Sequence, residues 1–362
     1  ILTPKTVSAN PITEFEYDSS VSPVALGAFI YFPFARGSFT GVREFTVNSN
    51  TDVFDANEIT SHVPQYVPTG IVSMTGSSSE ELLALTDGTD IYIYKYFFSG
   101  DEKVLSSWSK FTISGGGIRG IGFVDSDLYI VQCPSGASAP QTHLLKLPLE
   151  NKQRDAEGYN THLDKRVDVT FNADAAVPTF NVTYMLASGE TLQAYTKDGL
   201  LLQNIKFASK TDPGITTVTF KDNIVSGGVT GAAVELYVGI PYTMKYTFSE
   251  QLFKVGATDR PSPTDAGRML IRNGSLFFTD TSHFKVKVTP HLRNTSESEF
   301  NATVVQATTE GSMPLESNSF RFPVFTDPKG TVITIENASA APCNLQSAEF
   351  ESFIHQRSRR YG

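Results

Sequence analysis

Residues Leu82 to Ile113 read LLALTDGTDIYIYKYFFSGDEKVLSSWSKFTI, and this stretch decides the fold class. Its centre, Ile91 to Phe98, is β-branched and aromatic, a composition that favours a β-strand. Alternate residues of a strand point to opposite faces, and here both faces are apolar: Ile91, Ile93 and Phe97 on one, and Tyr92, Tyr94, Tyr96 and Phe98 on the other. We therefore expect a strand that other layers cover on both sides.

Turn residues bracket this strand. Asp87-Gly88 precedes it, Ser99-Gly100-Asp101 follows it, and the chain then returns through a second apolar segment, Val104 to Ile113. This pattern predicts a hairpin inside a stack of sheets, as in a sandwich or a propeller blade.

The length of 362 residues allows two or three domains and a full hydrophobic core. Ile1 is not an initiator Met and the opening residues have no signal-peptide pattern, so we expect the sequence to begin partway into a longer protein. The longest uncharged apolar run, Val21 to Ala35, is interrupted by prolines and is too short to span a bilayer. The only two cysteines, Cys133 and Cys343, exclude a disulfide framework and a four-cysteine zinc module.

The net charge of −9 and the pI near 5.2 argue against tight binding of nucleic acid, which depends on many cationic contacts to phosphate. A conduit that DNA only passes through is compatible with this charge. Each contact between a lysine and a DNA phosphate would slow the passage of DNA, and an acidic chain makes few such contacts.

Short strands separated by turns recur along the chain, and we predict an all-β protein. Two segments are exceptions. Asp55 or Asn57 is expected to cap a single helical turn that Pro64 ends, and Ala348 to Arg357 is the best candidate for a longer helix. A polar or small turn precedes an apolar strand near Phe29, Ile91 and Leu128, which is a weak indication of propeller blades.

Gly115 to Gly120 matches the G-x-G-x-x-G pattern of dinucleotide sites. That site needs a helix directly after the glycines, whereas Ile121-Gly122-Phe123-Val124 indicates a strand. We interpret the glycines as a loop between strands and expect no cofactor.

Two aspartate pairs, Asp87/Asp90 and Asp125/Asp127, could place oxygens around a calcium ion. Both pairs lie in turns, where aspartate commonly caps the local backbone, and no further acidic ligands follow at the required spacing. The turn interpretation is therefore favoured, and we expect neither a metal site nor a catalytic site.

The sequence ends in a compact basic segment that contains Arg357, Arg359 and Arg360. A solvated tail is the simpler interpretation. The alternative is a contact of these arginines with an acidic neighbouring subunit or with DNA phosphate.

Several longer motifs resemble the tail tubular protein B family, the nozzle proteins of short-tailed bacteriophages (podoviruses). In the first part of the chain these motifs are Leu2-Thr3-Pro4-Lys5-Thr6, Gly37-Ser38-Phe39 with Val42-Arg43-Glu44, ANEITSHVPQYV from Ala56 to Val67, Tyr94-Lys95-Tyr96 and Ser107-Trp108-Ser109-Lys110. Glu58 replaces the usual Asp of the third motif, and Phe111 stands where a second Trp is common.

The likeness extends over nearly the whole chain. The later motifs are Tyr237-Val238-Gly239-Ile240-Pro241-Tyr242, Gly267-Arg268, VKVTP from Val286 to Pro290, Phe322-Pro323-Val324, Pro342-Cys343, QSAEFE from Gln346 to Glu351 and Arg357-Ser358-Arg359-Arg360. Phe350 and Ser352 replace the usual Trp and Gly.

The resemblance implies the C-terminal half of a structural virion protein of the phage tail. It implies a hexameric nozzle ring below the tail adaptor protein, which forms the distal channel for double-stranded DNA, docks tail fibres and gates genome ejection. It also implies part of a β-propeller in residues 1–145, a second β domain in 146–260, and a sandwich-like platform domain with the basic tail in 261–362. No enzymatic activity and no membrane-spanning segment are expected.

A second hypothesis from another class stays open at this point. Aromatic β surfaces around Tyr92, Tyr94 and Trp108 could stack on sugars, as in a carbohydrate-binding or carbohydrate-degrading protein of the virion surface. We expect these side chains to be buried instead.

Overall fold

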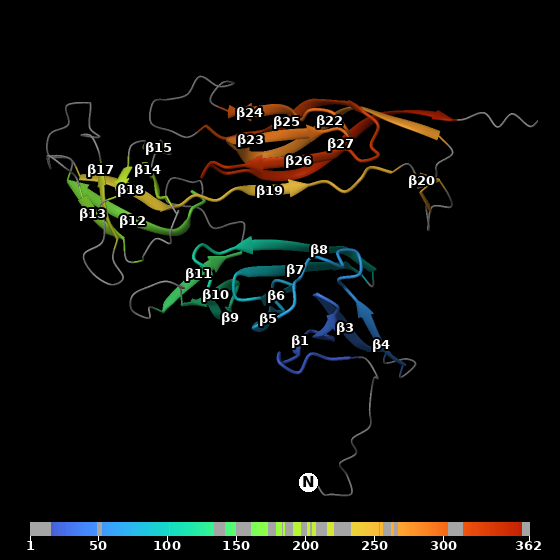
Figure 1. The fold of residues 1–362 in the computed structure, drawn as a ribbon, viewed down its shortest axis with the longest axis horizontal. Helices are drawn as coiled ribbons and strands as arrows, with labels where there is room; N and C mark the ends of the chain where they lie inside the picture. Colours follow the sequence, from blue (N-terminus) through green and yellow to red (C-terminus); the bar gives the residue numbers. More distant parts are fainter. Residues whose placement is uncertain are drawn as a thin grey trace, which may run out of the picture. The chain divides into compact units, whose positions relative to one another are not determined.

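The computed structural model describes residues 16–48, 53–100, 102–133, 142–149, 161–172, 179–182, 184, 191–196, 201–202, 205–207, 216–220, 233–252, 254–255, 262–263, 267–302 and 314–356. The named elements of these residues are 27 β-strands, which confirms the all-β prediction (Figure 1). The chain forms two compact units. Described residues up to 149 belong to the first unit, and most of those from 161 onward belong to the second.

Three antiparallel meanders build the first unit. Their strands are β1 (Val24–Leu26), β2 (Phe29–Arg36), β3 (Phe39–Asn48) and β4 (Val53–Glu58); β5 (Ser73–Ser77), β6 (Leu82–Thr86), β7 (Asp90–Ser99) and β8 (Glu102–Thr112); and β9 (Ile118–Val124), β10 (Asp127–Gln132) and β11 (His143–Pro148). In each meander, strands that follow one another in sequence are also neighbours in the sheet.

The middle meander is covered on both faces, as its sequence predicted. Tyr92, Tyr94 and Tyr96 of β7 pack with Leu26, Tyr31 and Val42 of the first meander. On the opposite face of the middle sheet, a second apolar cluster joins it to the third meander: Leu82, Ala84, Ile91, Ile93, Ile118, Leu128 and Ile130. The first unit is therefore a stack of three sheets with two apolar layers between them.

Phe97 differs from the prediction for this strand. Its side chain is 49% exposed, although Ile91 and Ile93 on the same face are buried. Phe97 pairs with Leu105, which is also exposed, directly before a register shift in the β7–β8 ladder. The apolar cover of this face therefore does not extend to the end of the hairpin.

The first part of the second unit contains two small sheets. Their strands are β12 (Asp164–Asn172), β18 (Ala233–Ile240), β14 (Gln193–Thr196) and β15 (Leu201–Leu202), and β13 (Thr179–Val182), β17 (Thr216–Phe220) and β16 (Ile205–Phe207). Tyr195 and Tyr237 pack against Leu163 and Ala340. The Tyr195 hydroxyl accepts a hydrogen bond from the Ala340 amide at 3.4 Å, which ties the larger of these sheets to the C-terminal part of the unit.

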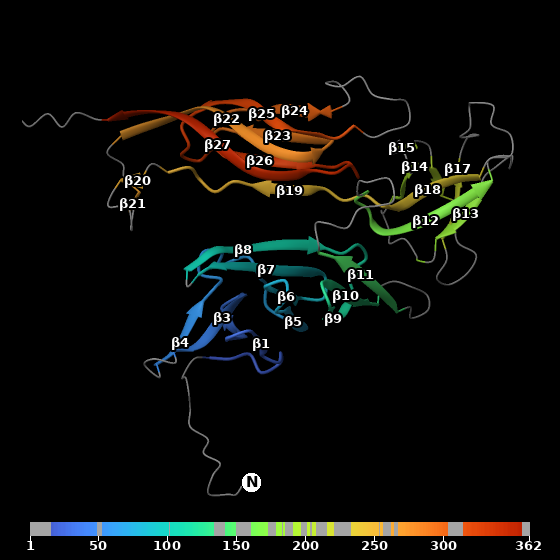
Figure 2. The ribbon, with the colours of Figure 1, turned by 180° about the vertical axis from the view of Figure 1, so that it is seen from behind.

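The C-terminal part is a β-sandwich, visible in Figures 1 and 2 as two sheets that run alongside each other. One sheet has the order β19-β26-β23-β24 and the other β25-β22-β27. The strand bounds are β19 (Met244–Thr247), β22 (Gly267–Thr281), β23 (His283–Thr289), β24 (Ser296–Asn301), β25 (Glu316–Thr326), β26 (Val332–Asn337) and β27 (Asn344–Gln356), with a separate two-stranded ribbon of β20 (Lys254–Val255) and β21 (Ser262–Pro263).

Aromatic side chains fill the sandwich. Every second residue of β23 is buried, and Phe284, Val286 and Val288 thus point into the core. The Phe284 ring lies 5.3 Å from Phe278 and 5.1 Å from Phe300, measured between centroids. These rings come from β22, β23 and β24, so the cluster joins both sheets.

Both helix predictions are wrong. Asp55 and Asn57 lie in β4, where they are two residues apart on one face and their side chains form a hydrogen bond at 2.8 Å. Ala348 to Gln356 belongs to β27, which pairs with β22 along nearly its whole length. In both places the hydrogen bonds to a neighbouring strand outweigh the local helical preference.

The predicted domain boundaries at 145/146 and 260/261 stay predictions. No helix among the described residues has the length and apolar composition that crossing a membrane requires.

Replacing Gly274 with alanine should destabilise the sandwich by about 1–3 kcal/mol, because extra atoms in a packed core force neighbours to move. Gly274 lies opposite Phe322 in the β22–β25 ladder, and a Cβ atom there would come within 2.3 Å of the Phe322 ring. Phe322 is fully buried and has little room to shift. The measurement is the urea unfolding midpoint.

Gly120→Ala is the matched control. Gly120 also lies in a strand, and nothing lies within 4 Å of a Cβ built on it. Equal losses of stability in the two variants would contradict the packing argument.

Candidate functional site: a charged network between two sheets

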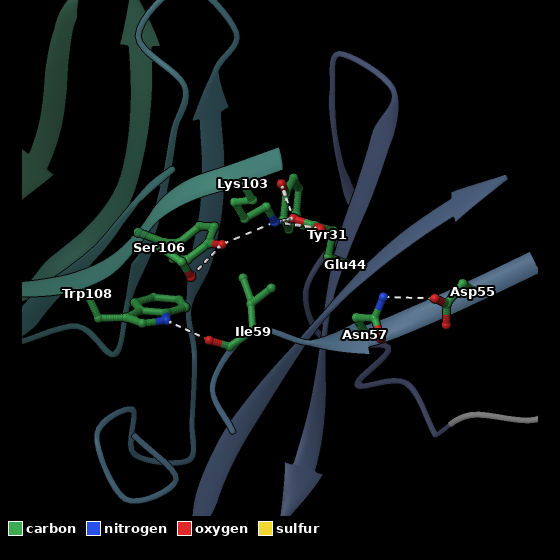
Figure 3. A network of polar contacts seen from close by, with 9 residues as sticks. Tyr31, Glu44, Asp55, Asn57, Ile59, Lys103, Ser106 and Trp108 are labelled. Carbon is green, nitrogen blue, oxygen red and sulfur yellow. Dashed lines mark hydrogen bonds and ion pairs between the residues drawn. The ribbon is translucent and has the colours of Figure 1, made fainter. Parts of the chain in front are cut away.

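A charged network lies between the first and second meanders (Figure 3). Lys103 of β8 places its Nζ 2.6 Å from each carboxylate oxygen of Glu44 on β3. The Tyr31 hydroxyl of β2 donates to Glu44 Oε2, also at 2.6 Å. The Glu44 carboxylate therefore accepts hydrogen bonds from Tyr31 of its own sheet and from Lys103 of the facing sheet.

Strand register explains the position of Glu44. Tyr31 and Glu44 are paired residues of the β2–β3 ladder, so their side chains lie on the same face. That face is the one covered by the second meander, and Tyr31 is fully buried while Glu44 is 7% exposed. Burial, and secondarily the hydrogen bond to Glu44, raises the pKa of Tyr31, which keeps the hydroxyl protonated as a donor.

Aromatic rings surround the ammonium group of Lys103. Its Nζ lies between 5.4 and 5.9 Å from the ring centroids of Phe29, Tyr94, Tyr96 and Phe98. At such distances the negative faces of aromatic rings attract a cation. Lys103 Nζ also donates to the Tyr94 hydroxyl at 3.4 Å, and that hydroxyl shares a hydrogen bond of 3.1 Å with Ser106.

The chemistry of this network is that of a structural tie. The Glu44 carboxylate accepts from both Lys103 and Tyr31 and is nearly inaccessible to solvent. The network links the two sheets at one relative position, because a displacement would leave the buried Glu44 carboxylate without its donors.

Trp108 provides a second tie between the same sheets. Its Nε1 donates to the Ile59 carbonyl at 3.0 Å, and its ring lies 5.1 Å from that of Tyr94. Trp108 is half-buried, Tyr92 is 2% exposed and Tyr94 is fully buried. These side chains are used inside the protein, and the hypothesis of a sugar-stacking surface on them is not supported.

Trp108→Ala should lower the free energy of unfolding by about 3 kcal/mol, at the lower end of the range for buried aromatic residues because part of the ring is exposed. The Ile59 carbonyl would also lose its donor. Chemical denaturation followed by circular dichroism measures the change. Phe111→Ala is the control: Phe111 lies on the same strand and is 37% exposed, so a loss as large as that of Trp108→Ala would contradict this assignment.

Asp87 and Asp125 lie in turns, as predicted, whereas Asp90 and Asp127 are the first residues of β7 and β10. Asp87 Oδ1 accepts from the amides of Thr89 and Asp90 at 2.8 and 2.7 Å, while Asp90 Oδ2 pairs with Lys110 at 3.2 Å. Asp125 has a positive φ of 54° in the turn between β9 and β10. Asp127 pairs with Lys146 at 2.6 Å. No cluster of three or more potential metal ligands occurs among the residues that the structure describes.

The glycine-rich segment leads into a strand. Gly115, Gly116 and Gly117 all have positive φ, and β9 begins at Ile118. This is the loop between strands that the sequence predicts. Arg357, Arg359 and Arg360 lie outside the described residues, and their contacts remain a prediction.

Sequence reasoning missed the Glu44–Lys103 pair. A signal was present, because Glu44 is in phase with Val42, which is fully buried. A carboxylate at a core position needs a donor. Nothing in the sequence indicated that the donor would be Lys103, 59 residues later.

Comparison with known proteins links this chain to phage tails. The tail tubular protein gp12 of Escherichia phage T7 is 26% identical to it over 378 aligned positions, which cover 99% of this chain and 46% of the T7 protein. The chain thus spans about half the length of this curated relative.

Two solved structures overlap with this chain at low similarity. Two structures of an exo-β-1,3-galactanase from Phanerochaete chrysosporium, one with galactotriose and one with galactose, overlap 89% of this chain and 78% of theirs at 10% identity and a TM-score of 0.18. Such a score carries no argument about fold or activity.

The family model described as bacteriophage nozzle protein matches residues 1–361. Since this match covers nearly the entire sequence, the chain belongs to the bacteriophage nozzle protein family.

Proposed function

We propose that this chain is a structural component of the virion tail and forms part of the wall of a hexameric nozzle ring. The observation that carries the proposal is the family match over residues 1–361. The T7 relative, a tail tubular protein, supports a homo-oligomeric assembly in the tail. Stacked sheets that are linked by a buried ion pair suit the wall of a ring, because they keep their shape without a bound ligand.

Within this ring, residues 1–145 form the last blades of a β-propeller, 146–260 a second β domain, and 261–362 a platform domain. The three meanders support the first assignment. Residues of β5 lie within 8 Å of residues of both β1 and β9, so the first strands of successive meanders are neighbours. Successive propeller blades have this arrangement around their central axis.

The ring surrounds the distal DNA channel, lies next to the tail adaptor protein, docks tail fibres and gates genome ejection. The net charge of −9 supports passage without adhesion, because DNA phosphates repel an acidic wall. The proposed exception to this weak adhesion is the basic C-terminal segment. It would contact a neighbouring subunit or the phosphates of passing DNA through Arg357, Arg359 and Arg360.

The family and the T7 relative are tail proteins, and we infer that the chain has a mechanical and not an enzymatic role. Glu44, the carboxylate of the network, accepts hydrogen bonds from Lys103 and Tyr31, in keeping with that role.

Electron microscopy of the purified full chain tests the proposal. We expect hexameric rings or their partial assemblies, and only weak, strongly salt-dependent binding of duplex DNA. A particle that stays monomeric at every concentration would defeat it.

A further inference from the structure

We draw no further inference here: the strongest candidate, the apolar groove lined by Phe248 and Leu345 between the edge strands β19 and β27 of the C-terminal sandwich, carries nothing because nothing in the part of the chain that the structure describes shows what covers it.

Discussion

Glu44→Leu is expected to lower the free energy of unfolding of the first unit by about 3 kcal/mol, the lower end of the cost of removing one partner of a buried ion pair, because the Lys103 side chain that is left unpaired is 22% exposed. Lys103 would keep its ammonium group among four aromatic rings without a carboxylate, and the Tyr31 hydroxyl would lose its acceptor. The cation–π attraction that remains is worth only about 0.5–2 kcal/mol and does not replace the ion pair. Urea denaturation of the full chain, followed by tyrosine and tryptophan fluorescence, measures the loss.

A triple variant separates the ion pair from the packing around it. Tyr31→Phe/Glu44→Leu/Lys103→Met replaces the ion pair and the Tyr31 hydroxyl with apolar groups of similar volume, and we expect its stability to equal that of the wild type or to exceed it by up to about 4 kcal/mol. Arg36→Ala is the surface control, since Arg36 pairs with Glu58 on the exposed part of the same sheet. Its expected cost is about 0–1 kcal/mol. A Glu44→Leu variant that behaves like Arg36→Ala would show that the network is not structural.

Phe284→Ala should destabilise the C-terminal sandwich by about 3–5 kcal/mol, the range for a buried phenylalanine truncated to alanine. Phe284 is fully buried, and its ring contacts Phe278, Phe300 and Phe320 from three other strands. These neighbours belong to separate strands of two sheets, so they cannot close the cavity together without shifting the sheets. The loss should therefore fall in the upper half of that range.

The same substitution at Phe353 is the control. Phe353 lies on β27 and is 49% exposed, so we expect Phe353→Ala to cost no more than about 1 kcal/mol. Differential scanning calorimetry of both variants distinguishes the outcomes. Equal shifts of the melting temperature would indicate that the phenylalanine cluster does not hold the two sheets together.

The architecture was predictable where a strand carries its own signal. Ile91 to Phe98 is apolar on both faces, and the structure buries Ile91 and Ile93 in one cluster and Tyr92, Tyr94 and Tyr96 in another. The alternation of buried and partly exposed side chains along β23 is equally easy to recognise. The alternation of buried and exposed residues along a strand is a local property, and it can be recognised without knowing which sheet packs against that strand.

Prediction failed where a distant strand decides the local conformation. Ala348 to Gln356 mixes good helix formers with aromatic residues, yet β22 supplies a ladder of hydrogen-bond partners along the whole segment. The Glu44–Lys103 network could not be predicted from the sequence for a related reason. Glu44 is recognisable as a buried carboxylate, but Lys103 belongs to a different sheet, and the packing of two sheets is not encoded in the periodicity of either.

The long strand β22 has a consequence for the lifetime of the folded chain. It pairs with β25 along one edge and with β27 along the other, and it passes through the phenylalanine cluster. Its amide groups alternate between the two ladders, so exchange along the whole strand requires both ladders to open. Hydrogen exchange should therefore be slowest in this strand, and the C-terminal domain should open rarely compared with its edge strands. Durability of that kind suits a protein that has no opportunity to be resynthesised once its particle has left the cell.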